Sequence, residues 1–232
     1  SVVDVDGGNG GNPCDWRNGT TNNPDCTAVP VPINEENVVP GGGQTIKRIP
    51  VQGVYHVGEG GLLGMALHPN FSNNRFLYLY YTYGQSNQIK NRVVRFVFKN
   101  DSLSEPKIII DNIPGSSNHN GGRIAFGPDN QLYVTTGDSG VEMLAQDKNS
   151  LAGKILRVTD QGAISQGNPF KNMIYSYGHR NPQGLAWDNQ GYLWSTEHGR
   201  SGLVSGFDEL NLIEKGKNYG WPIIEGSQTK AG

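Results

Sequence analysis

The sequence predicts an all-β protein built as a propeller of four-stranded blades. Its 232 residues include 33 glycines and 13 prolines, and short apolar runs rich in β-branched and aromatic residues recur between them. Such runs, bounded by turn residues, are typical of short strands. A motif also repeats at a nearly constant spacing, which is the signature of an architecture built from equivalent units.

Three alanines mark the centres of the repeat. Ala66, Ala125 and Ala186 are 59 and 61 residues apart, and each lies in a short apolar strand followed by a turn rich in Pro, Asp, Asn or Gly. The second strand of each repeat is expected at 76–81, 131–136 and 192–196, and further strands at 92–98, 108–110 and 154–158. Two hairpins per repeat give one four-stranded blade, and repeated blades protect their sheet edges. A sandwich of similar hairpins is the alternative, but equal repeats of this length favour a propeller with roughly four blades in this chain.

Composition limits the partners of the protein. Charged residues make up 17% of the chain and the formal net charge is −2, so neither nucleic acid nor an acidic membrane surface is an expected partner. No stretch of about 18 apolar residues occurs, so no membrane span is expected. No basic region precedes an apolar core at the N-terminus, which indicates that a signal peptide is either removed or was never present.

Residues 1–45 differ from the remainder, 46–232, which holds the repeats. This first segment is rich in Gly, Asn and Pro and is expected to form an irregular arm. Cys14 and Cys26 lie close together within it and fit a local disulfide better than a metal site, with two unpaired thiols as the alternative. Sequons for N-glycosylation begin at three asparagines: Asn18, Asn70 and Asn100. These features predict an exported protein, extracellular or periplasmic.

A histidine stands out in the loop before the second repeat. His119 is surrounded by small and polar residues, which leave space around its ring. A neutral imidazole near pH 7 is the usual side chain for accepting a proton from an alcohol. The alternative is a structural role, which is the more common role of a loop histidine considered alone.

Three further clusters carry polar side chains. Arg180 is a fixed planar cation suited to a carboxylate, and Asn181 precedes a proline that favours an extended backbone. The segments 197–200 and 208–211 contain carboxylates and loop carbonyls, which are hard oxygen ligands that suit calcium. No cysteine and histidine set has zinc spacing. No GK[ST] sequence occurs, so no phosphate-binding loop is expected. No G-x-S-x-G elbow occurs either, which argues against a serine hydrolase.

Five segments together resemble the glucose/sorbosone dehydrogenase family of soluble aldose dehydrogenases. They are GEGGLLGMALHPNF (58–71), NHNGGRIAFGPDNQLYVTTGD (118–138), AQDKNSLAGKILRV (145–158), YSYGHRNPQGLAW (175–187) and GKNYGWP (216–222). They occur in the family's order and cover about residues 46–226, so the resemblance is far more specific than any single motif. The resemblance implies a six-bladed propeller that uses pyrroloquinoline quinone (PQQ) and a calcium ion (Ca2+).

The resemblance also implies roles for individual residues. His119 would be the base that takes the proton from the C1 hydroxyl of an aldose, while hydride passes to the quinone and the lactone forms. Arg180 and Asn181 would hold cofactor oxygens, together with a first-blade polar residue that maps to Glu59. Calcium would bind two backbone carbonyls, those of Gly199 and Arg200. An external electron acceptor would reoxidise the cofactor, which carries the redox chemistry.

Three departures from the family pattern keep a second function open. Glu59 stands where glutamine is usual, Arg200 stands where proline is usual, and residues 201–206 resemble an insertion. The chain also ends after GKNYGWP, although later blades of the family contribute a lysine and arginines to the cofactor site. The expectation is therefore a C-terminally incomplete propeller, closed by missing sequence or by a partner or second copy. The alternative function is a non-catalytic extracellular propeller that serves as a binding or structural module.

Overall fold

The computed structural model describes residues 49–200 and 207–226. These residues belong to one compact unit of the chain, Lys47–Gly232. The predicted arm, with Cys14, Cys26 and the sequon at Asn18, lies outside the described residues, so the disulfide stays a prediction. The other two predicted sequons begin at Asn70 and Asn100, and both of these side chains are exposed.

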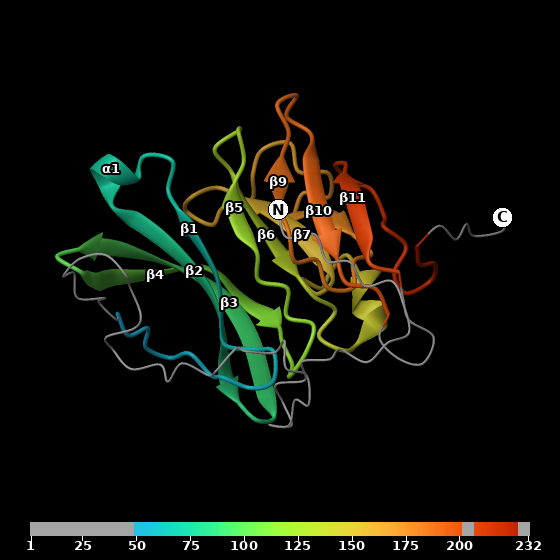
Figure 1. Ribbon diagram of the computed structural model, residues 1–232, viewed down its shortest axis with the longest axis horizontal. Helices are drawn as coiled ribbons and strands as arrows, with labels where there is room; N and C mark the ends of the chain where they lie inside the picture. The colour runs from blue at the N-terminus through green and yellow to red at the C-terminus, as the bar shows by residue number, and fades with distance from the viewer. Residues whose placement is uncertain (1–48, 201–206, 227–232) are drawn as a thin grey trace, which may run out of the picture. The chain divides into compact units, whose positions relative to one another are not determined.

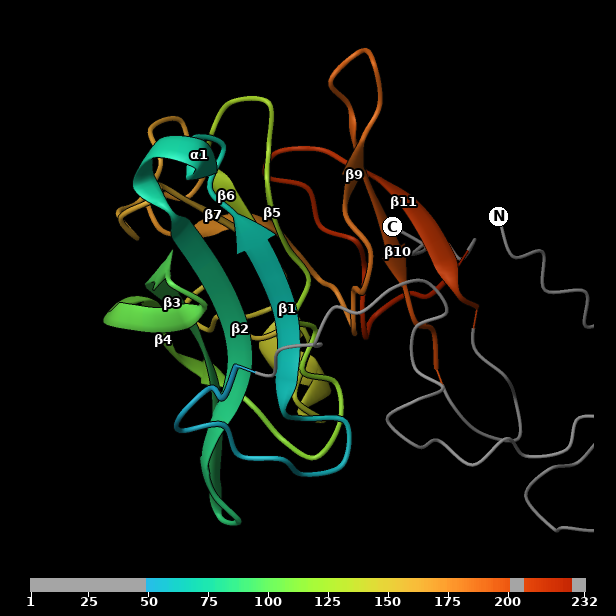
Figure 2. The same ribbon diagram turned by 60° about the vertical axis from the view of Figure 1, so that its left-hand side comes forward.

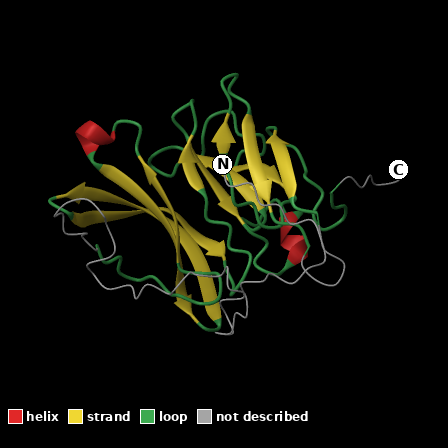
Figure 3. Cartoon of the chain, viewed as in Figure 1, coloured by secondary structure: helices red, strands yellow, loops and turns green. Residues whose placement is uncertain are grey.

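The described residues form three antiparallel sheets, two with four strands and one with three (Figures 1 and 3). The first sheet holds β1 (Leu62–Leu67), β2 (Phe76–Gln85), β3 (Gln88–Lys99) and β4 (Ser102–Pro114). The second holds β5 (Ile124–Phe126), β6 (Leu132–Thr136), β7 (Lys154–Val158) and β8 (Ile174–Tyr177). The third holds β9 (Ala186–Trp187), β10 (Leu193–Glu197) and β11 (Glu209–Ile213). Short helical turns occur at α1 (Phe71–Asn74) and η2 (Glu142–Ala145), and neither is long enough to cross a membrane.

The all-β architecture with four-stranded blades is confirmed. Ala66, Ala125 and Ala186 lie in β1, β5 and β9, which are the first strands of their sheets. Within each sheet the strands follow one another in chain order, as expected for a propeller blade. β1 and β5 contact each other, and the three sheets lie side by side (Figure 2).

Three strands are longer than the sequence predicts, and two were not expected. β2 continues past the predicted 76–81 to Gln85. β4 begins before the predicted 108–110. Its first half is polar and contains Pro106, so it does not resemble a strand in the sequence, but β4 lies at the edge of its sheet and an edge strand tolerates both features. β3 extends beyond the predicted 92–98 on both sides. β8 and β11 lie in segments that were interpreted for their polar side chains alone, so their pairing with β7 and β10 was missed.

The cores lie between neighbouring sheets, and the alternation of side chains along the strands creates them. Tyr78 and Tyr80 of β2 are fully buried on the face toward the second sheet, whereas Leu79 and Tyr81 pack on the opposite face. The cluster between the first two sheets is made of strand residues from both: Tyr78, Tyr80, Val93, Ile110, Val134, Leu156 and Val158. A second interface joins Tyr133 and Ile155 to Leu193 and Ile213 of the third sheet.

The antiparallel pairs also decide where the loops lie. Ile124 of β5 pairs with Val134 of β6, so the residues before β5 and those after β6 share one end of the second sheet. By the same geometry, the residues before β9 and after β10 share one end of the third sheet. Loops that are far apart in sequence therefore gather at one end of the molecule.

Val134→Ala tests the packing between the first two sheets. Val134 is fully buried in this cluster, so the loss of its methyl groups and the resulting cavity are expected to lower the free energy of unfolding by about 2 kcal/mol. Urea denaturation of the purified protein measures this change. The matched control is Val141→Ala, because Val141 is 54% exposed and its truncation should change the free energy little. Equal effects of the two substitutions would contradict the assigned core.

Candidate active site

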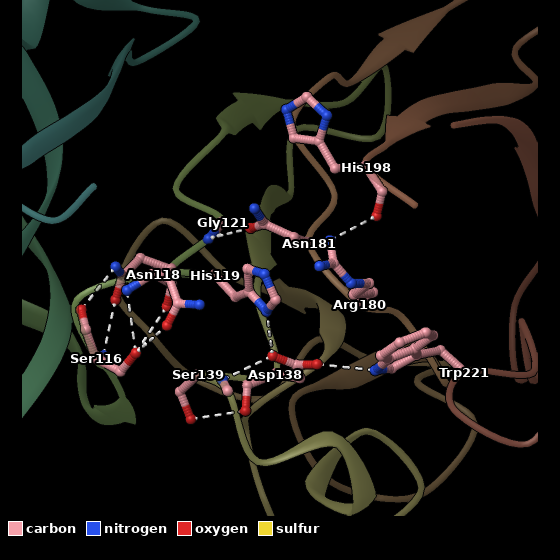
Figure 4. A network of polar contacts seen from close by, with 12 residues as sticks. Ser116, Asn118, His119, Gly121, Asp138, Ser139, Arg180, Asn181, His198 and Trp221 are labelled. Atoms are coloured by element: carbon pink, nitrogen blue, oxygen red, sulfur yellow. Dashed lines mark hydrogen bonds and ion pairs between the residues drawn. The ribbon is translucent and has the colours of Figure 1, made fainter. Parts of the chain in front are cut away.

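Polar side chains gather where the strands of neighbouring sheets end (Figure 4). His119 comes before β5, Asp138 follows β6, and Arg180 and Asn181 come before β9. Glu59 comes before β1, at the corresponding position of the first sheet. The structure therefore brings together residues that the sequence singled out in three separate repeats, and it adds Asp138, which the sequence did not single out.

A buried carboxylate holds the His119 ring. The distance from Nδ1 of His119 to Oδ1 of Asp138 is 2.8 Å, and the two side chains are 15% and 0% exposed. Asp138 also accepts hydrogen bonds from the Gly140 N–H to Oδ1 and from the Trp221 indole N–H to Oδ2, each at 2.8 Å. A carboxylate accepts hydrogen bonds, so the neutral tautomer of His119 that fits this contact carries its proton on Nδ1 and its lone pair on Nε2.

The backbone of His119 is strained and is fixed on both sides. Its φ of 52° lies in the left-handed region, which is uncommon for a residue other than glycine. The His119 N–H donates to Oε2 of Glu59 at 2.9 Å, and its carbonyl accepts from the N–H of Ser139 at 3.1 Å. A Cβ atom at Gly137 would lie 1.9 Å from the His119 carbonyl oxygen, so only glycine allows this close approach.

Asn181 connects the third sheet to the loop of His119. Its Oδ1 accepts from the backbone N–H of Gly121 and from the side-chain amide of Gln183, each at 3.0 Å. Both bonds use the oxygen, and Nδ2 makes no hydrogen bond to the residues that the structure describes. Asn181 is almost fully buried, so its amide is held in place and can donate to a bound ligand.

Arg180 rests on a buried hydrogen-bonded triad. Nε2 of His179 lies 2.8 Å from the Ser176 hydroxyl, and Nδ1 lies 2.8 Å from Oε2 of Glu197. The other oxygen of Glu197 accepts from the backbone N–H of Arg180, whose guanidinium donates to the carbonyl of His198 at 3.3 Å. All three members are buried, with Ser176 and His179 fully so, which makes the triad a support for Arg180 and not an accessible nucleophile.

The predicted calcium loop lies next to Arg180. A small hollow is lined by Arg180, Glu197, His198, Gly199 and Trp221, among others. The backbone N–H of Gly199 donates to Asp208 at 2.9 Å. Within 49–200 and 207–226, no three His, Cys, Asp or Glu side chains are arranged to hold a metal ion.

Arg200, which the sequence analysis expects at a position where proline is usual, is tied to a carboxylate. Its backbone N–H donates to Oε1 of Glu225 at 2.6 Å, and its guanidinium Nε lies 3.3 Å from Oε2. The guanidinium also lies 4.9 Å from the centre of the Trp221 ring, and that of Arg180 lies 5.4 Å from it. Both distances are within the range of cation–π attraction.

A buried lysine supports the loops on which this site rests. Nζ of Lys154 donates to the carbonyls of Leu144, Ala145 and Ala152 at 2.8, 3.0 and 2.5 Å. Burial lowers the pKa of Lys154 to about 7, and the nearby carboxylate of Asp147 acts in the opposite direction. The Ala145 carbonyl also accepts from the N–H of Gly178, so Lys154 holds a backbone segment that contacts the Arg180 loop.

Lys154→Met is expected to change how stability depends on pH. The folded protein releases this proton near pH 7, whereas an unfolded lysine keeps it to about pH 10.5. Between these values the unfolded chain binds more protons, so the wild-type free energy of unfolding should rise with pH relative to the variant, by up to about 1.4 kcal/mol per pH unit. Urea denaturation of both proteins at pH 7, 8 and 9 measures the difference. Parallel pH profiles would contradict the lowered pKa.

Several of these residues were missed from the sequence. Asp138 and Trp221 lie inside the quoted motifs but were given no role, although Asp138 directly follows a strand and a glycine. That position, at the same end of the sheet as His119, is a signal that could have identified it. The buried positions of Lys154 and Glu197 follow from sheet packing, for which the sequence offers no comparable signal.

Comparison with known proteins agrees with the fold. The family model for glucose/sorbosone dehydrogenase matches residues 37–232. Quinoprotein glucose dehydrogenase B of Acinetobacter calcoaceticus is 35% identical over 206 residues, covering 75% of this chain and 42% of that protein. Aldose sugar dehydrogenase YliI of Escherichia coli is 38% identical over 191 residues, covering 75% of this chain and 50% of that protein.

A solved structure of an aldose sugar dehydrogenase is also similar to this chain in fold and sequence. The PQQ-bound form of aldose sugar dehydrogenase from Streptomyces coelicolor superposes with a TM-score of 0.71 at 47% identity, over 76% of this chain and 52% of that one. The chain spans about half the length of the curated relatives it matches. These matches, and the order of the motifs, show that the chain belongs to the glucose/sorbosone dehydrogenase family.

Proposed function

We propose that the complete protein containing this chain oxidises an aldose at C1 to the lactone, with His119 as the base. The observation that carries this proposal is the pairing of the His119 ring with a fully buried carboxylate. Asp138 accepts from Nδ1 and leaves Nε2 as the proton acceptor, which is the state a general base needs. The ring is 15% exposed and so can be reached by a substrate hydroxyl.

The chain's residues account for the proton in this reaction. Nε2 of His119 takes the proton of the C1 hydroxyl as the C1–H bond breaks, and the oxygen's electron pair forms the new C=O bond. The positive charge that develops on the imidazole is stabilised by Asp138 at 2.8 Å. The carboxylate is itself fixed by Gly140 and Trp221, so the ring does not need to reorganise during proton transfer.

The donor set around His119 fits an anionic quinone such as PQQ. Arg180 supplies a planar cation held on a buried support, and Nδ2 of Asn181 supplies an oriented donor. Glu59 adds a negative charge, but its carboxylate already accepts the N–H of His119, which partly neutralises it. PQQ, when bound, would accept the hydride from C1.

A calcium ion is part of the same proposal. Its ligands in this chain would be the carbonyl oxygens of Gly199 and Arg200, next to the hollow beside Arg180. The Arg200 guanidinium brings a positive charge to this loop, and Glu225 balances it. The proposed partners are the aldose and an external electron acceptor. The proposed location is extracellular or periplasmic, and the predicted disulfide and the sequons support it.

His119→Ala tests the assigned base. Loss of general base catalysis is expected to lower kcat by about 10²- to 10⁴-fold, while the affinity for the quinone changes little. Dye reduction with a panel of aldoses measures turnover in the complete protein reconstituted with PQQ and Ca2+, and fluorescence titration measures quinone binding. The matched control is His68→Gln. His68 lies in the turn after β1, where its ring hydrogen-bonds to Asn70 and Asn74, and it is not part of the proposed site. Unchanged turnover of His119→Ala would refute the assignment.

The same assay decides between the enzyme and the binding module. A complete protein that binds no quinone and oxidises no aldose would contradict the proposed dehydrogenase and favour the non-catalytic propeller. Quinone binding with sugar-dependent dye reduction is the expected result.

A further inference from the structure

Trp221 reaches the site from a distant part of the chain. It lies 83 residues after Asp138, beyond β11, and it is 4% exposed. Its indole N–H donates to Oδ2 of Asp138 at 2.8 Å (Figure 4). It makes this contact on the carboxylate oxygen opposite to the one that faces His119.

We propose that Trp221 is a positioning residue for the base, acting through Asp138. This inference rests on the proposed function, in which His119 is the base. The two oxygens of Asp138 divide their contacts, with Oδ1 facing His119 and Gly140, and Oδ2 facing the indole. The indole therefore fixes the rotation of the carboxylate about its Cβ–Cγ bond, and this keeps Oδ1 in line with Nδ1 of His119.

The tryptophan is itself held by its backbone. The Trp221 N–H donates to the carbonyl of Gly178 at 3.0 Å, and its carbonyl accepts from the side-chain amide of Gln146. The Gln146 side chain also bonds to Asn218 of the same loop at 3.0 and 2.8 Å. These bonds hold the backbone that carries the indole, so contacts within the chain direct its N–H toward Asp138.

The donor matters separately from the ring. Buried Asp138 has no access to water, so the loss of one N–H leaves Oδ2 without the donor it has in the wild type. The Trp221 ring has a second set of neighbours, the guanidinium groups of Arg180 and Arg200. Phenylalanine keeps an aromatic ring for these cations and removes only the N–H, so it separates the two roles.

Trp221→Phe in the complete protein is the test. Loss of a hydrogen bond to a charged group is expected to lower kcat about tenfold or more, with the KM for the aldose and the quinone affinity nearly unchanged. The matched control is Trp194→Phe, because Trp194 donates its indole N–H to Oδ2 of Asp188 at 3.0 Å in a turn at the other end of the third sheet. The control should leave kcat unchanged. Equal effects of both substitutions, or no effect of Trp221→Phe, would overturn the inference.

A double-mutant cycle shows whether Trp221 acts through Asp138. In an Asp138→Ala background the indole has no carboxylate to fix, so Trp221→Phe should cause no further fall in kcat. Additive losses in the double variant would overturn the proposal, because they would show that Trp221 acts independently of Asp138.

A measurement without turnover separates this inference from the proposed function. The indole N–H resonance of Trp221, assigned by its loss in Trp221→Phe, should move in Asp138→Asn in quinone-free protein, while that of Trp194 stays in place. An unmoved Trp221 resonance would overturn the contact. A moved resonance in a protein that oxidises no sugar would uphold the Trp221–Asp138 contact while the dehydrogenase proposal fails.

Discussion

Hydrogen bonds between equivalent positions of consecutive blades hold the end of the molecule where the site lies. The contact from His119 to Glu59 spans 60 residues, as does the contact from Gly121 to Asn181. The bond from Arg123 to the Gln183 carbonyl spans 60 residues as well. This interval lies between the 59 and 61 residues that separate the repeated alanines. One structural period therefore sets both the packing of the blades and the contacts among the site loops.

Each ionisable group buried at this end has several polar partners. Asp138 has three donors, and Glu197 accepts from both the ring of His179 and the backbone of Arg180. Lys154 donates to three carbonyls. Loss of one partner would leave a buried group unsatisfied, so the proposed base, its carboxylate and the Arg180 support depend on a network that extends well beyond them.

The sequence was sufficient for the architecture and for the location of His119. Repeats of nearly equal length require equivalent units, and antiparallel hairpins bring the ends of their strands together, so the loops with His119, Arg180 and Asn181 had to converge. The contacts of Asp138 with Trp221 lay beyond this reasoning. They join residues 83 positions apart, one after β6 of the second sheet and one after β11 of the third, and no local pattern encodes such a pairing. β11 was missed for a related reason, since its polar residues resembled ligands and its pairing with β10 is a tertiary feature.

The two unusual residues of the site are accommodated by local pairing. Glu59 uses a carboxylate oxygen for the N–H of His119, an interaction that the side-chain oxygen of a glutamine could also make, so the substitution adds charge without a new geometry. Arg200 adds a positive charge, but Glu225 and the Trp221 ring hold its guanidinium. The one negative and one positive addition leave the net charge of these two positions unchanged relative to a glutamine and a proline. The strained backbone of His119 is consistent with this view, because a φ of 52° persists only where the surrounding contacts compensate for its cost, and the Glu59 carboxylate provides one of them.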